Sequence, residues 1–168
     1  MKLPICSFDA KVGVLCPKCE AKVQSGELTK TDVDVSFALA KLSGKQPILD
    51  RITLRRAYMI DGETVLLLGQ GDTSLLRSNP KVMQAIQEAL GRRVWTTEAD
   101  SDDRRFLESL LFPARVMTMN TIFVPDGSRI MKVIIPGRMT PKFPVDLEKV
   151  KSIVRETRGI DLVVRFER

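Results

Sequence analysis

The three cysteines of this chain carry the clearest chemical signal in its sequence, and all of them lie near the N-terminus. The segment CPKC (residues 16–19) has the spacing with which two thiolates chelate one zinc ion. The segment CSFD (residues 6–9) repeats that spacing with a carboxylate in the last position. A hairpin through residues 11–13 would bring the two turns together. We therefore expect a tetrahedral Zn²⁺ site formed by Cys6, Asp9, Cys16 and Cys19.

Other uses of these thiols remain open at this point. Cys16 and Cys19 can form a redox-active pair, an iron–sulfur site can be completed by another chain, or the thiols can pack in a small core without a ligand. A thioredoxin-like site is less favoured, because that motif follows a strand in a larger βαβ unit that residues 1–28 cannot provide.

The composition argues against most catalytic mechanisms. The chain has no histidine, so it lacks the commonest general base and any Ser-His or Cys-His nucleophile pair. Asp100, Asp102 and Asp103 form an acidic cluster, but they precede an expected helix, whose dipole favours acids at that end. We expect that the chain is not an enzyme.

The charge and hydropathy of the chain indicate its compartment and partners. The formal net charge is +6, which makes a polyanionic partner plausible. No apolar run approaches the roughly 18 residues that a membrane helix needs, and the N-terminal residues lack the hydrophobic stretch of a signal peptide. We therefore expect a cytoplasmic protein with no membrane partner and, since 43% of its residues are hydrophobic, a genuine core.

Hydrophobic periodicity and turn residues divide the rest of the chain into helices and strands. A linking helix is expected within residues 29–46, stopping at Gly44, and Asp-Gly pairs at 61–62 and 126–127 predict two hairpins. The expected strands span residues 52–60, 63–69, 92–98, 115–124, 129–137 and 160–167, and the further helices span about 80–90, 102–112 and 146–159.

These elements form a strand-strand-helix-strand unit twice, at a period of roughly 65 residues. The order is that of a KH module, in which a Gly-x-x-Gly loop between two helices clamps nucleotides. We predict an α+β fold with a Cys-rich knuckle or zinc hairpin (1–28), the linking helix (29–46), a first KH-like domain (47–113) and a second, degenerate KH-like domain (114–168).

The sequence between residues 69 and 116 resembles the archaeal NusA-like transcription factors, from their first KH domain into the second. The matching features are Gly71-Asp72, the helix at 82–90, the segment GRRV at 91–94, the acidic turn before Phe106, and the segment FPARV at 112–116. The resemblance extends over roughly residues 50–168. It implies a protein that contacts RNA, RNA polymerase or another ribonucleoprotein complex, or both RNA and such a complex, in transcription elongation or termination or in a related process.

The chain departs from that family at the nucleotide loops, which read RSNP (77–80) and KFPV (142–145). Side chains at the former glycine positions obstruct a close phosphate backbone, and Pro80 also lacks an amide donor. Cationic side chains can still hold phosphates in a salt-sensitive manner, and Phe143 is the best candidate for base stacking. The candidate nucleic-acid residues are Arg77, Ser78, Asn79, Lys81, Arg92, Arg93, Lys142 and Phe143. The alternative is an adaptor whose degenerate KH folds bind proteins of a ribosomal, transcription or RNA-processing complex.

Overall fold

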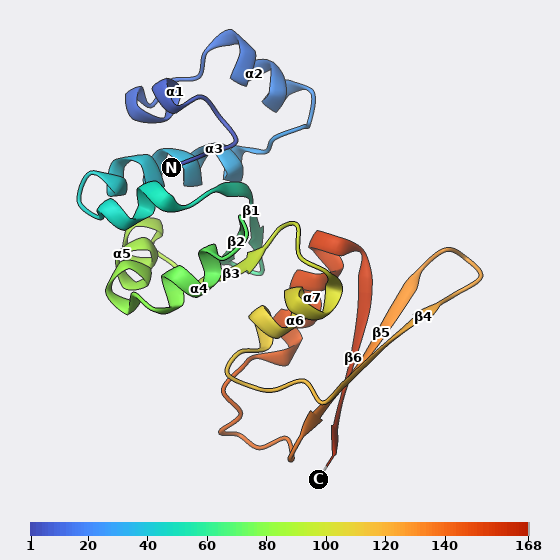
Figure 1. Cartoon of the computed structure of the whole chain (residues 1–168). Helices are drawn as coiled ribbons and strands as arrows, with labels where there is room; N and C mark the ends of the chain where they lie inside the picture. The colour runs from blue at the N-terminus through green and yellow to red at the C-terminus, as the bar shows by residue number, and fades with distance from the viewer. Residues whose placement is uncertain (168) are drawn as a thin grey trace. The chain divides into compact units, whose positions relative to one another are not determined.

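The computed structural model describes residues 1–167, and the chain forms two compact units, Met1–Asp100 and Ser101–Arg168 (Figure 1). Each unit contains one three-stranded sheet with helices packed against it. The α+β class expected from the sequence is therefore confirmed.

The first unit holds most of the helices. Its elements in chain order are α1 (Ser7–Val12), α2 (Pro17–Gln24), α3 (Lys30–Ser43), the 3₁₀ helix η1 (Pro47–Arg51), β1 (Leu54–Ile60), β2 (Glu63–Leu68), α4 (Asp72–Arg77), α5 (Pro80–Leu90) and β3 (Val94–Glu98). The sheet order is β1-β2-β3, with β1 antiparallel and β3 parallel to β2.

The core of the first unit lies between its sheet and the helices α3 and α5. Leu66 and Leu68 of β2 are almost completely buried and cluster with Leu39 of α3 and Ile86 of α5. Burial of such side chains contributes about 1.5–3 kcal/mol each. The helix α5 has Pro80 in its first turn and ends at Gly91, whose φ of 69° suits a residue without a Cβ.

A buried aspartate of α3 joins this helix to the edge of β1. Asp32 is fully buried, and its carboxylate accepts hydrogen bonds from Ala57 N (2.7 Å), Arg56 Nε (3.1 Å) and Thr29 N (2.8 Å). Asp32 is also the third helical residue of a capping box with Thr29. The same carboxylate thus caps the start of α3 and satisfies a buried amide of the sheet edge.

The second unit repeats the strand order and strand directions of the first. It contains α6 (Asp103–Leu111), β4 (Thr118–Phe123), β5 (Arg129–Pro136), α7 (Leu147–Arg158) and β6 (Ile160–Glu167). The sheet order is β4-β5-β6, with β4 antiparallel and β6 parallel to β5. Figure 1 shows α6 and α7 on one side of this sheet. The internal repeat expected from the sequence is therefore present in strand order and strand direction.

The acidic cluster around residue 100 serves structural contacts. Asp102 caps α6 by accepting from Arg105 N at 2.8 Å. Asp103 pairs with Arg158 at 2.7 Å, and Arg158 also donates to the carbonyl of Ser101 at 2.6 Å. Asp103 therefore ties the start of α6 to the end of α7, beyond any effect of the helix dipole.

Two local expectations differ from the structure. Residues 11–13 form the end of α1 and its cap rather than a hairpin, and the N-terminal module consists of two short helices. The reason is that Gly13 adopts a φ of 82° and Pro17 lies in the first turn of α2, which are a helix stop and a helix start. In addition, the sequence predicts one helix between the second and third strands of each unit. The first unit has two helices there, α4 and α5, whereas residues 137–146 of the second unit form turns without a helix before α7.

Among residues 1–167, none of the helices combines the length and the apolar character needed to cross a bilayer.

Candidate functional site

The four predicted metal ligands lie at the N-terminal ends of two short helices. Cys6 is the N-cap of α1 and Cys16 is the N-cap of α2. Asp9 and Cys19 follow at the third helical position of the same helices. Side chains at the N-cap and the third position of a helix meet in the geometry that also produces a capping box. The i, i+3 spacing of each pair therefore places both of its donor groups on the same side of a helix start.

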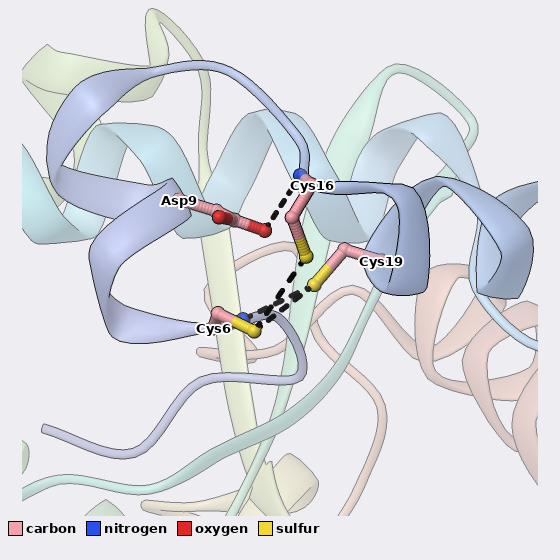
Figure 2. A group of neighbouring side chains, drawn as sticks. All are labelled: Cys6, Asp9, Cys16 and Cys19. Carbon is pink, nitrogen blue, oxygen red and sulfur yellow. Dashed lines mark hydrogen bonds between the residues drawn. The ribbon is translucent and has the colours of Figure 1, made fainter.

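The two helix starts face each other and exchange hydrogen bonds (Figure 2). The amide of Cys16 donates to Asp9 Oδ2 at 2.9 Å, and the amide of Cys6 donates to Cys19 Sγ at 3.3 Å. In an ordinary capping box the third-position side chain accepts from the N-cap amide of its own helix. Here each accepts from the other helix, so the two segments are held together at the ligands themselves.

The spacing of the donor atoms fits one tetrahedral metal ion. The Sγ atom of Cys6 lies 3.5 Å from that of Cys19 and 3.9 Å from that of Cys16. With Zn–S bonds of about 2.3 Å, two sulfurs of a tetrahedral site lie about 3.8 Å apart. The four donor atoms, including a carboxylate oxygen of Asp9, all lie within 4.8 Å of one another. The predicted set is thus brought together with a geometry compatible with metal binding.

Burial and hydrogen bonds shift the pKa values of two of the four candidate ligands. Cys19 is 2% exposed, and this burial raises the pKa of its thiol to about 12. Hydrogen bonds from Cys16, above all from its backbone amide, lower the pKa of Asp9. Without a metal, Cys19 is therefore a neutral thiol at neutral pH, which disfavours a reactive redox cysteine because the thiolate is the nucleophile. A bound cation reverses this preference by stabilising the thiolate.

The module around the ligands has only a small apolar core. Ile5, Ala10, Cys19 and Leu28 are buried together with Val33 of α3. A core of this size contributes little stability by itself, and small domains of this kind commonly depend on a metal or disulfides.

The predicted RNA contacts of the first unit divide into two groups. The first is the turn between α4 and α5. Ser78 Oγ donates to the carbonyl of Ser74 at 3.0 Å, and the amide side chain of Asn79 donates to the carbonyl of Leu75 at 2.8 Å. These two side chains therefore cap α4. Arg77 and Lys81 are exposed at the same turn.

The second group lies at the opposite end of α5. An eleven-residue helix is about 16 Å long, so Arg92 and Arg93 do not form one cluster with the turn. The guanidinium of Arg93 lies over the ring of Trp95 at 4.7 Å, and Arg92 donates to the Leu90 carbonyl at 3.2 Å. Both arginines remain exposed.

In the second unit, Lys142 is exposed, whereas Phe143 is half-buried. The ring of Phe143 packs edge-to-face against Phe166 of β6, with 5.2 Å between the centroids. Phe143 thus has an aromatic partner within its own unit.

A basic pocket of about 570 Å³ in the first unit was not anticipated from the sequence. Three chain segments meet there: residues 2–4, residues 22–28 and the beginning of β1. The sequence shows Lys2, Lys22 and Arg55 as scattered cations, and only tertiary packing brings them to one cavity. No local spacing could have identified this group.

Comparisons with known proteins bear on the fold only. No family model matches the chain. The fold resembles solved structures, among them the crystal structure of APE1850, which superposes with a TM-score of 0.56 at 17% sequence identity. That superposition covers 77% of this chain and 96% of the other. At such low identity the likeness concerns the arrangement of helices and strands.

Proposed function

We propose that this chain is an RNA-binding protein of the KH type, related to NusA-like transcription factors, with an N-terminal module held together by Zn²⁺. The observation that carries the RNA proposal is the exposed turn between α4 and α5, which follows a β-hairpin and precedes a parallel strand. In KH modules the corresponding turn contacts the nucleic-acid backbone.

The contacts at this turn involve side-chain charge rather than a backbone clamp. Ser78 and Asn79 are engaged in capping α4, and Pro80 has no amide to donate. Arg77 and Lys81 flank these residues and are exposed. We expect them to hold phosphates, which produces salt-sensitive binding with little sequence preference.

The RNA proposal is tested by removing the two charges of the turn. The double variant Arg77→Ala/Lys81→Ala should bind single-stranded RNA more weakly in filter binding, and the slope of log K against log salt should fall by about 1.4. The matched control is Lys41→Ala/Lys45→Ala, which removes two exposed charges near the end of α3. Equal affinities of the two double variants would contradict a role for the turn. Wild-type affinity no greater than that of a charge-matched unrelated protein would contradict RNA binding itself.

Zinc is the metal that three thiolates and one carboxylate suit best, because thiolates select soft or borderline ions and the donor set is complete within one chain. A bound ion would cross-link α1 to α2 through all four side chains. Its role would be structural, since four protein ligands leave no open position for a substrate.

Elemental analysis of protein purified without an affinity metal tests this assignment. We expect about one zinc per chain, a loss of zinc in Cys16→Ser and weaker retention in Asp9→Asn. The matched control is Glu20→Gln, an exposed acid of α2 outside the cluster. Substoichiometric zinc that is unchanged in Cys16→Ser would rule out the site.

The second candidate function is a protein-interaction adaptor. It is favoured by apolar side chains on the face of the second sheet opposite its helices, where Ile122 is 50% and Val163 is 41% exposed. Partners captured from a nuclease-treated lysate would favour the adaptor. Partners that disappear with the RNA would argue against it.

A further inference from the structure

The pocket in the first unit exists because a short parallel pairing along the edge of β1 stops early. The amide of Lys2 donates to the carbonyl of Ile52 at 3.1 Å, and the amide of Leu54 donates to the carbonyl of Lys2 at 2.8 Å. The next donor of such a ladder would be residue 4, which is a proline and has no amide hydrogen. The N-terminal segment therefore leaves the strand edge at Pro4. The space that opens there is bounded on its other side by residues 22–28.

The lining of this pocket combines an apolar wall with a basic rim. The apolar wall consists of the half-buried Leu3 and Pro4, which lie over the buried side chains of Leu28 and Leu54. The rim carries four cations, Lys2, Lys22, Arg55 and Arg56, against one acid, Glu27.

Two of the four cations have partners inside the unit. Arg56 is paired with the buried Asp32 at 3.1 Å, so its charge is largely balanced. Arg55 lies 3.5 Å from Asp100, but both side chains are more than half exposed, and such surface pairs hold their partners weakly. Lys2 and Lys22 form no ion pair with any side chain in the described part of the chain. The rim thus keeps an excess of positive charge next to an apolar surface.

From these features we propose that the pocket binds one nucleotide unit of an RNA strand, with its phosphate against Lys2, Lys22 and Arg55 and its base against the apolar wall. The proposal rests on the RNA-binding function and adds to it a contact on the N-terminal module that carries the proposed metal site (residues 1–28, here called the metal module). The volume of about 570 Å³ lies within the usual range for sites that hold small organic ligands. An acidic peptide would match the cations but would leave the apolar wall without a partner.

The site is tested first on the unaltered protein by titrating ¹⁵N-labelled protein with uridine monophosphate. The amide signals of Thr53, Arg55 and Leu28 should shift with the nucleotide. They should shift less with inorganic phosphate, which lacks the base. Unmoved signals would overturn the proposal, as would equal shifts with hexaglutamate.

The second test compares two double variants in single-stranded RNA binding at 0.15 M salt. Lys2→Ala/Lys22→Ala should weaken binding about 10-fold, the loss expected when two phosphate contacts disappear. The control Lys11→Ala/Lys30→Ala removes two exposed charges from the same region but outside the pocket, and it should change affinity less than 3-fold.

These outcomes separate the pocket from the function on which it rests. If the α4–α5 turn variant weakens RNA binding while the pocket variant matches its control, RNA binding stands and the pocket proposal falls. If the wild-type protein binds RNA no better than a charge-matched unrelated protein, both fall.

Discussion

Replacing Asp32 by alanine tests how strongly α3 is fixed to the sheet. The change removes the acceptor of the buried Ala57 amide, the third-position partner of the capping box and the counter-ion of Arg56. An unsatisfied buried amide costs about 1–3 kcal/mol and a lost cap about 1 kcal/mol. The ion pair adds only about 1 kcal/mol, because Arg56 is 31% exposed and can recover water. We expect a loss of about 3–5 kcal/mol in the free energy of unfolding.

The assay for Asp32→Ala is urea unfolding followed by tryptophan fluorescence. Trp95 is the chain's single tryptophan and lies in β3 of the first unit, so the signal reports that unit alone. The matched control is Asp34→Ala, an exposed acid of the same helix, which should change stability by less than about 0.5 kcal/mol. Asp32→Asn keeps one acceptor oxygen and should fall between them. Asp32→Ala and Asp34→Ala proteins of equal stability would refute the reasoning.

Three further perturbations test the metal site and one contact in each unit. Since the pKa of the Cys19 thiol is raised to about 12, zinc must displace its proton at neutral pH. Zinc affinity should therefore fall as the pH falls, and calorimetry in buffers of different ionisation enthalpy should detect proton release. The metal-free protein should lose stability relative to Cys19→Ala as the pH rises from 9.0 toward about 12. Gly69→Ala would place a Cβ 3.0 Å from a buried carboxylate oxygen and should cost about 1–3 kcal/mol. Gly44→Ala, whose Cβ would make only an ordinary van der Waals contact with the Lys41 carbonyl oxygen at 3.7 Å, should be neutral or stabilising in the same fluorescence assay. In the second unit, Arg158→Ala should lower the free energy of unfolding by about 2–4 kcal/mol, because it removes the ion pair with Asp103. Arg155→Ala, at an exposed position of the same helix, should lower it by less than about 0.5 kcal/mol. Both changes are measured by hydrogen exchange of β5 amides.

The regular elements of both units could be predicted because their boundaries are marked by local chemistry. Asp61-Gly62 and residues 126–127 mark the hairpins, and Gly91 and Gly159 end α5 and α7 with positive φ. These signals depend on a few neighbouring residues, so a single sequence carries them. The short helices α1, α2 and α4 were missed because they have only six, eight and six residues, too few for a helical period to emerge.

The metal cluster could be predicted from the sequence, whereas the basic pocket could not. Each pair of metal ligands has an i, i+3 spacing that is visible in the sequence, and the structure needs only to bring two such pairs together. The pocket depends on where Lys22 and Arg55 meet in space, which is fixed by the packing of the metal module against α3 and by the early end of the pairing at Pro4. Neither segment contains a sequence feature that predicts the proximity of Lys22 and Arg55.

The helix α3 contacts both the small core around the cysteines and the edge strand β1. Val33 packs into the core of the metal module, while the adjacent Asp32 holds an amide of β1. A disturbance on one side of this helix therefore reaches the other through consecutive residues. If the module binds zinc as proposed, removing the ion with a chelator should loosen the sheet edge as well as the cysteine-bearing helices, and the amount of available zinc would then affect how well the pocket is formed.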